Sequence, residues 1–100
     1  MLTAKQRKYL KGLANDLRPT VVIGKNGLTE NIYAELATGF RTRELVKVDI
    51  QKGSPLDAKE TANLLAEEMG AEFVQAIGRK FVLYRAPEDP KEAKIQLPKG

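Results

Sequence analysis

The residues whose types and spacing are best suited to chemistry lie directly after a short apolar stretch. Residues 21–23 are two valines and an isoleucine, typical of a buried strand, and residues 24–27 read Gly-Lys-Asn-Gly. Glycines permit backbone conformations and close approaches that a Cβ would block. Thr29 is suited to begin a helix, whose first amides attract anions. The segment therefore predicts a phosphate-binding loop. Its proposed contacts are Gly24, Lys25, Asn26, Gly27 and Leu28.

Most enzyme chemistries find no support in the composition. The chain has no cysteine and no histidine, which excludes thiolate chemistry and removes the usual metal ligand and general base. The loop is not a nucleotide-binding P-loop, because Gly27 is followed by Leu28 and Thr29 rather than by Lys and Ser or Thr. We therefore predict a protein that is not an enzyme and has no cofactor, no metal and no small-molecule substrate.

Positive charge is concentrated in the half of the chain that contains this loop. The net charge is +4, and residues 51–100 carry equal numbers of acidic and basic side chains, so the whole excess lies in residues 1–50. A clustered basic surface favours a polyanionic partner such as nucleic acid. The charge alone is also compatible with an ordinary solvated surface that binds no polyanion.

The elements that must position the loop begin with a helix over residues 4–17, with Thr3 and Gln6 as a capping box. Tyr9, Leu10, Leu13 and Leu17 share one face of this helix, which we expect to be buried. Basic residues lie elsewhere on the helix and near the end of the next one. The candidate contacts to a nucleic-acid backbone among them are Lys5, Arg7, Lys8, Lys11, Arg41 and Arg43.

The remaining elements follow from periodicity and turn signals. Strands are expected at 20–23, 45–50, 73–77 and 81–84. Helices are expected from Thr29 to about Phe40, with Gly39 weakening or ending it, and from Ser54 as N-cap to Gly70. In the second strand, Val46, Val48 and Ile50 should face inward. Gly78-Arg79 is typical of a type II′ hairpin.

This order predicts a single compact α/β domain, α-β-α-β-α-β-β, with helices packed on a mixed four-stranded sheet. The first two strands should be parallel if they share that sheet, and the closing hairpin must be antiparallel. We expect the domain to span residues 1–86. Residues 87–100, with three prolines and alternating charges, are expected to form a partly ordered tail.

Several segments resemble the YhbY family, the bacterial stand-alone form of the CRM (chloroplast RNA splicing and ribosome maturation) domain. They are 9–14, 19–30, 44–48, 74–78, 82–85 and 94–99, in the family's order. The resemblance implies a fold similar to the C-terminal domain of translation initiation factor three, and it places the family's G-x-x-G loop on residues 24–27. Asn15 stands where relatives commonly have histidine, so no imidazole acts there.

The resemblance also implies RNA binding and association with precursors of the large ribosomal subunit. Without an aromatic stacking platform, binding should depend on phosphates and therefore on salt. Residues 1–6 contain no apolar signal-peptide core, and we expect a cytoplasmic monomer that binds RNA and no membrane. The alternative is a protein-interaction adaptor whose basic face meets an acidic partner.

Overall fold

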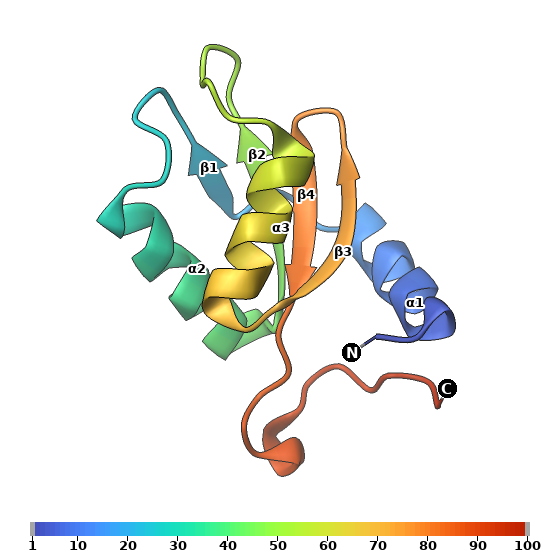
Figure 1. The fold of residues 1–100 in the computed structure, drawn as a ribbon. Coiled ribbons are helices and arrows are strands. Elements are labelled where there is room, and N and C mark those ends of the chain that lie inside the picture. The colour runs from blue at the N-terminus through green and yellow to red at the C-terminus, as the bar shows by residue number, and fades with distance from the viewer. Residues whose placement is uncertain (1, 100) are drawn as a thin grey trace.

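A four-stranded sheet with helices on both faces forms the structure (Figure 1), a computed structural model that describes residues 2–99. The helices are α1 (Ala4–Asn15), α2 (Glu30–Arg43), α3 (Ala58–Met69) and the short 3-10 helix η1 (Pro90–Glu92). The strands are β1 (Val21–Ile23), β2 (Leu45–Ile50), β3 (Glu72–Ile77) and β4 (Lys80–Tyr84). Met1 and Gly100, the outer limits of the expected domain and tail, lie outside the described residues.

The sheet confirms the predicted α/β class and its mixed topology. Its strand order is β1-β2-β4-β3, with β1 parallel to β2 and both other pairs antiparallel. Gly78, which begins the β3–β4 turn, has a φ of 60°, whereas Arg79 does not have a positive φ. This combination is the one that a type II′ hairpin requires. Because β1 and β2 are parallel, the loops that follow them emerge at the same end of the sheet (Figure 1).

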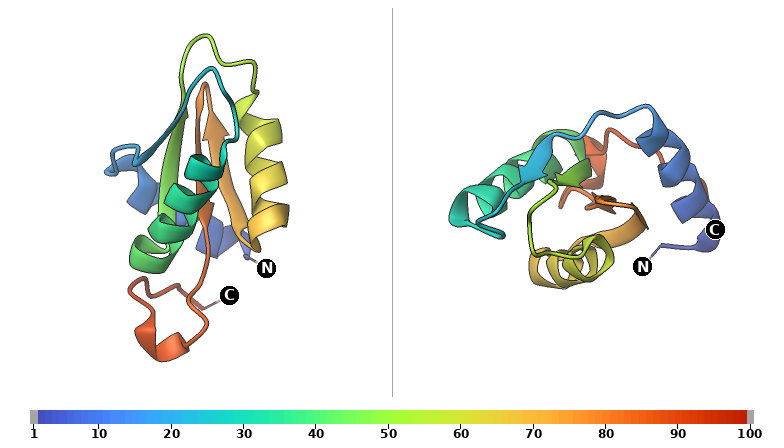
Figure 2. Two further views of the ribbon diagram at one scale, coloured as in Figure 1. Left: turned by 90° about the vertical axis from the view of Figure 1, so that its left-hand side faces the viewer. Right: turned by 90° about the horizontal axis from the view of Figure 1, so that it is seen from above.

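Each face of the sheet has its own hydrophobic core. Helices α2 and α3 cover one face and α1 covers part of the other (Figure 2). The predicted alternation in β2 is confirmed, because Val46, Val48 and Ile50 are buried against α2 and α3. Leu45 packs in the second core with α1, and the half-buried Lys47 reaches the end of that helix. Its ammonium donates to the carbonyls of Ala14 and Leu17, both at 3.2 Å.

The buried face of α1 differs from the prediction. The capping box of Thr3 and Gln6 is present, but the helix ends at Asn15 rather than near Leu17. Its buried residues are Leu10 and Ala14. The side chains of Tyr9, Leu13 and Leu17 are 42%, 36% and 37% exposed, so the expectation that they are buried was wrong. The helix does have an apolar stripe, but the sheet contacts only one edge of the stripe, because α1 covers only part of its face of the sheet.

Helix α2 continues through Gly39 to Arg43, so the expected end near Phe40 was wrong. Gly39 allows a close approach instead. A Cβ at this position would lie 2.9 Å from Cγ2 of Val46, which is fully buried and β-branched, with little freedom to move. Ile32, Leu36 and Phe40 form the buried stripe as predicted. The glycine thus lets the backbone of α2 lie directly on β2.

Helix α3 begins later than expected. Asp57, not Ser54, is its N-cap, and the Asp57 carboxylate accepts a 3.0 Å hydrogen bond from the amide of Glu60. The hydroxyl of Ser54 instead accepts from the amide of Leu56 within the preceding loop. This loop is therefore longer than expected and extends beside the G-x-x-G loop (Figure 1).

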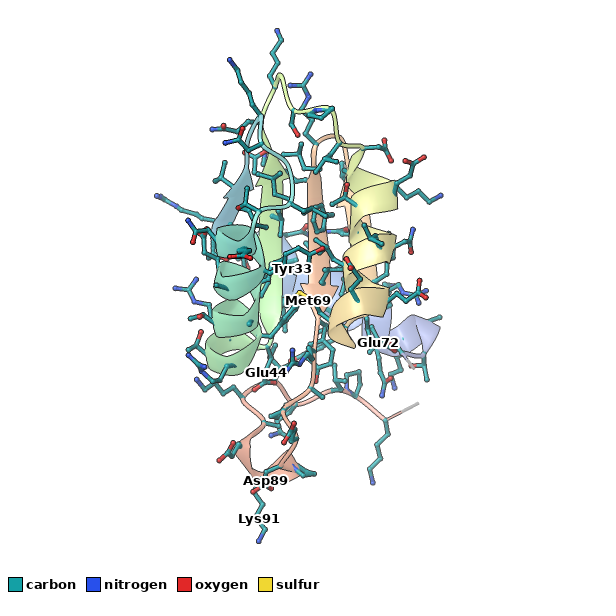
Figure 3. All side chains as sticks on the ribbon, turned by 60° about the vertical axis from the view of Figure 1, so that its left-hand side comes forward. Tyr33, Glu44, Met69, Glu72, Asp89 and Lys91 are labelled. Atoms are coloured by element: carbon teal, nitrogen blue, oxygen red, sulfur yellow. The ribbon has the colours of Figure 1, made fainter. Side chains whose placement is uncertain are left out.

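A tyrosine connects the two helices on this face. The hydroxyl of Tyr33 on α2 donates a 2.7 Å hydrogen bond to Glu68 on α3. Figure 3 shows Tyr33 and Met69 in the space between the two helices. The hydrogen bond to the carboxylate, more than burial or charge repulsion, raises the pKa of Tyr33 above 10.0.

The segment after β4 passes the end of the sheet and turns toward α1, and it is held by Glu44, which lies between α2 and β2. Glu44 is 2% exposed, and its carboxylate accepts hydrogen bonds from the amides of Lys94 (2.6 Å) and Ile95 (3.3 Å). Ile95 and Leu97 pack against the core under α1. Burial, and then the nearby Glu44 charge, raise the pKa of Tyr84 in the same region. One buried carboxylate thus fixes the path of this segment.

We predict that Gly39→Ala destabilises the protein although alanine favours helices. The gain in helix propensity is roughly 1 kcal/mol, whereas overpacking against a filled core costs about 1–3 kcal/mol. Gly12→Ala is the matched control, since a Cβ on Gly12 in α1 would meet nothing within 4 Å. Urea unfolding should show that Gly12→Ala raises the free energy of unfolding and that Gly39→Ala lowers it. An equal increase in the free energy of unfolding from both substitutions would contradict the close packing of Gly39 on Val46.

Candidate nucleic-acid interface

The G-x-x-G loop is a tight turn between β1 and α2. The amide of Gly27 donates to the carbonyl of Gly24 at 3.1 Å, and Gly27 has a φ of 68°. The side chains of Lys25 and Asn26, at the tip, are exposed. Within residues 2–99, the amides of Lys25, Asn26 and Leu28 donate no hydrogen bond to the chain. Three N–H groups are therefore available to an anion, but the amide of Gly27, expected to be one of them, is used inside the turn.

The start of α2 is less suited to an anion than expected. Thr29 is its N-cap, as predicted, and its hydroxyl accepts from the amide of Ile32 at 3.3 Å. Glu30 then places a carboxylate in the first turn, where it already complements the helix dipole. The amides of the turn, rather than those of the helix, are the better position for a phosphate.

The loop after β2 supports the turn from behind. The amide of Gln51 donates a 2.8 Å hydrogen bond to the carbonyl of Ile23, the last residue of β1. A Cβ on Gly24 would lie 3.3 Å from Oε1 of Gln51, and a Cβ on Gly27 would lie 3.9 Å from Cδ1 of Leu56. The hydrogen bond joins the end of β1 to the loop after β2, and side chains of that loop lie close to both glycines of the turn.

Three further cations lie at this end of the sheet and are absent from the predicted site. Lys52 follows Gln51, and Arg79 and Lys80 lie at the β3–β4 turn. The carbonyl of Arg79 accepts a 2.8 Å hydrogen bond from the amide of Ile50, which joins that turn to the end of β2. All three loops lie at one end of the molecule (Figures 1 and 2). The parallel pairing of β1 and β2 was the signal that could have identified Lys52.

Acidic residues offset part of this charge. Asp57 lies in the loop after β2, but its carboxylate is used as the cap of α3. Asp49 lies directly opposite Lys80 in the β2–β4 ladder. The exposed cations at the tips of the loops, Lys25, Lys52 and Arg79, are therefore the ones best placed to meet a phosphate chain.

The basic residues of α1 lie on a different side of the molecule from the loop (Figures 1 and 2). Lys5, Lys8 and Lys11 are exposed. Arg7 is half-buried, and its Nε donates a 3.3 Å hydrogen bond to the carbonyl of Phe73 in β3. Arg7 therefore connects α1 to the sheet and is less available than the lysines.

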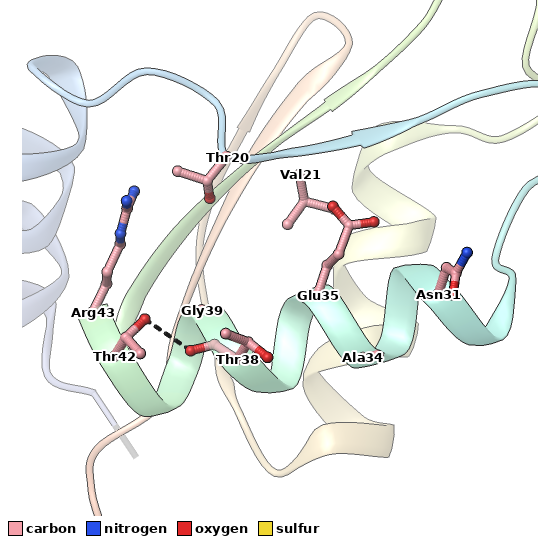
Figure 4. Close-up of a pocket in the computed structure, with 9 residues that line it drawn as sticks. All are labelled: Thr20, Val21, Asn31, Ala34, Glu35, Thr38, Gly39, Thr42 and Arg43. Carbon is pink, nitrogen blue, oxygen red and sulfur yellow. Dashed lines mark hydrogen bonds between the residues drawn. The ribbon is translucent and has the colours of Figure 1, made fainter.

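Arg41 and Arg43 lie at the opposite end of α2 from the loop. Eleven or more residues of helix separate them from Glu30, which is about 16–20 Å along the axis. Figure 4 shows Arg43 extending from the end of α2 toward the chain that precedes Thr20. Arg43 lines a hollow of about 410 Å³ between α2 and β1, whose other polar residues include Asn31 and Glu35.

No helix among residues 2–99 is long and apolar enough to cross a bilayer. The same residues contain no group of three or more acidic, His or Cys side chains arranged to hold a metal ion.

The family is decided by comparison with known proteins. The model of the CRS1 / YhbY (CRM) domain matches residues 2–85. The chain belongs to the CRS1/YhbY (CRM) family. It is 44% identical over 99 residues to an RNA-binding protein of Haemophilus influenzae, covering 98% of this chain and 96% of that one. It is 34% identical to the probable RNA-binding protein YqeI of Bacillus subtilis, covering 98% of this chain and all of YqeI.

A solved structure agrees with the CRM fold. The solution structure of the hypothetical protein SAV1595 from Staphylococcus aureus superposes with a TM-score of 0.79 at 39% identity. The match covers 98% of this chain and 100% of SAV1595. The resemblance that the sequence segments indicated is confirmed.

We predict that Gly27→Ala destabilises the protein more than Gly24→Ala does. A side chain at the positive φ of Gly27 costs roughly 1–2 kcal/mol. Gly24 has no such φ, and its Cβ would meet only the exposed, flexible end of Gln51. Urea unfolding measures both, and Gly24→Ala should stay within about 0.5 kcal/mol of the wild type. Equal losses would show that the turn geometry described here is wrong.

Proposed function

We propose that this CRM domain binds RNA through its backbone phosphates, with the turn at residues 24–28 as the primary contact. The observation that carries the proposal is the set of three available amides at Lys25, Asn26 and Leu28, held in place by the loop after β2. Phosphate oxygens accept hydrogen bonds from such amides, and the ammonium of Lys25 adds a charge-assisted contact. Asn26 then holds a neighbouring phosphate or sugar.

The other cations extend the contact. Lys52 and Arg79 flank the loop, and Lys5, Lys8 and Lys11 form a second basic region on α1. The molecule measures 40 × 23 × 23 Å, so a folded RNA can reach both regions at once. Arg7, Arg41 and Arg43 remain in the proposed contact set, although Arg7 already binds the Phe73 carbonyl. The names of the relatives support RNA as the partner.

We further propose that the RNA is ribosomal RNA in precursors of the large subunit, and that the protein acts there as a cytoplasmic monomer without catalysis. The family resemblance supports this assignment. Residues 1–86 form the RNA-binding domain in this proposal, and the family match to residues 2–85 supports that boundary. Residues 87–100 form the tail in this proposal, and hydrogen bonds from Lys94 and Ile95 to Glu44 hold that part of it against the domain.

Lys25→Ala should weaken binding to structured ribosomal RNA fragments and reduce the salt dependence. Loss of one phosphate contact lowers the slope of log K against log salt by about 0.7–0.9. Lys91→Ala is the matched control, since Lys91 is exposed at the end of the molecule remote from the loops (Figure 3). Fluorescence anisotropy at several salt concentrations gives both slopes. An unchanged slope for Lys25→Ala would remove Lys25 from the interface.

The assembly role predicts co-sedimentation with large-subunit precursors. In sucrose gradients of a cell lysate, the wild-type protein should migrate with these particles, and Lys25→Ala should shift toward the top. Digestion of the RNA before a pull-down separates this role from that of an adaptor for an acidic protein. Partners that remain bound after digestion, with no crosslinks between RNA and residues 24–28, would favour the adaptor.

A further inference from the structure

A second hollow lies between the end of α1 and the start of β1 and has a different character from the one in Figure 4. Its volume is about 370 Å³, within the roughly 300–1,000 Å³ typical of sites for small organic groups. Four aliphatic side chains line it: Leu13, Leu17, Leu45 and Ile95. Leu45 is nearly fully buried, whereas Leu13 and Leu17 are more than a third exposed. The hollow is thus an open apolar slot.

The polar rim of this slot is entirely cationic or neutral. Arg18, Thr20, Arg43 and Lys47 complete its lining, which contains no acidic residue. Among the described residues, the guanidinium groups of Arg18 and Arg43 have no ion-pair or hydrogen-bond partner. Lys47 is already bound to the two carbonyls at the end of α1. Two unpaired guanidinium groups therefore lie beside an apolar slot. This arrangement suits a flat, weakly polar group in the slot that has negatively charged groups next to it.

The slot also lies on the path between the two proposed RNA contacts. Leu13 belongs to α1, whose lysines form one basic region, and Thr20 directly precedes β1, whose other end carries the G-x-x-G loop. Strand β1 has three residues and is therefore roughly 10 Å long. That is about three stacked nucleotides at the roughly 3.4 Å rise of one strand in a duplex. An RNA strand gripped at residues 24–28 can thus reach the slot.

We propose that the slot receives the base of one unpaired RNA nucleotide, while Arg18 and Arg43 hold the phosphates on either side of it. This inference rests on the proposed RNA-binding function and deepens it. The aliphatic floor packs against the faces of the base, and the guanidinium groups bind phosphate through paired N–H donors. The base needs no partner strand, so the site selects unpaired nucleotides over paired ones. The phosphate loop alone supplies no such selection, because every nucleotide has a phosphate.

The test compares two RNA hairpins that differ by one unpaired nucleotide in the stem. The wild type should bind the hairpin with the unpaired nucleotide roughly tenfold more tightly, as expected when aliphatic side chains cover part of the apolar surface of one base. The double variant Leu13→Gln/Leu17→Gln should lose this preference yet bind the fully paired hairpin as the wild type does. Leu64→Gln is the matched control, because Leu64 is 47% exposed on α3, and it should keep the preference.

Nuclear Overhauser effects locate the base directly. Protons of the unpaired base should show contacts to the methyl groups of Leu13, Leu17 and Ile95. Saturating shifts of these methyl groups with an acidic leucine-rich peptide but not with RNA would overturn the proposal.

Failure of this proposal and failure of the proposed function give different results. Equal affinity of the wild type for the two hairpins, or a preference that survives in Leu13→Gln/Leu17→Gln, would overturn the base site alone. Absence of salt-dependent binding to both hairpins would overturn RNA binding itself and the base site with it. Lys25→Ala should weaken binding to both hairpins by the same factor, which separates the phosphate loop from the slot.

Discussion

Burial of β2 on both faces is the constraint on which the rest of the structure depends. Its Val46 meets the backbone of α2 at Gly39, and its Lys47 donates to the carbonyls that end α1. The residue before the strand, Glu44, holds the C-terminal segment, and the residue after it, Gln51, supports the G-x-x-G loop. Helices, tail and candidate interface are therefore all positioned by eight consecutive residues.

This arrangement explains how a three-residue strand can hold a functional loop. Strand β1 is short and lies at the edge of the sheet, so few backbone hydrogen bonds fix it. Burial of Val21 and Ile23 in the core with α2 and α3 supplies the remaining stability. The loop tip itself stays exposed, with its amides free of the chain. A fixed strand β1 and an exposed loop tip together suit a backbone that must accept an external anion without rearranging.

The charge distribution gives a consistent account of specificity. In the proposed RNA complex, cations at the loop end and on α1 meet phosphates, which every RNA presents, and they account for affinity rather than for choice of sequence. The apolar slot between these regions then offers a base a surface. A domain with few aromatic residues can thereby discriminate RNA structure through shape and exposure instead of through an aromatic platform.

Local sequence by itself determined the element types, the mixed sheet, the cap at Thr29, the II′ hairpin and the glycine turn. Each of these depends on side chains within a few residues, such as the alternation of Val46, Val48 and Ile50. The family segments, read in order, also determined the CRM fold.

Only the tertiary structure decided which edge of α1 is buried, why Gly39 is a glycine, and that the loops with Lys52 and Arg79 lie at the same end of the sheet as the loop with Lys25. These features depend on contacts between segments distant in the chain. Helical periodicity defines an apolar stripe but not the part of it that the sheet covers, and glycine spacing reveals a turn but not its neighbours. The slot between Leu13, Leu45 and Ile95 brings together three such segments, and for that reason no local pattern predicted it.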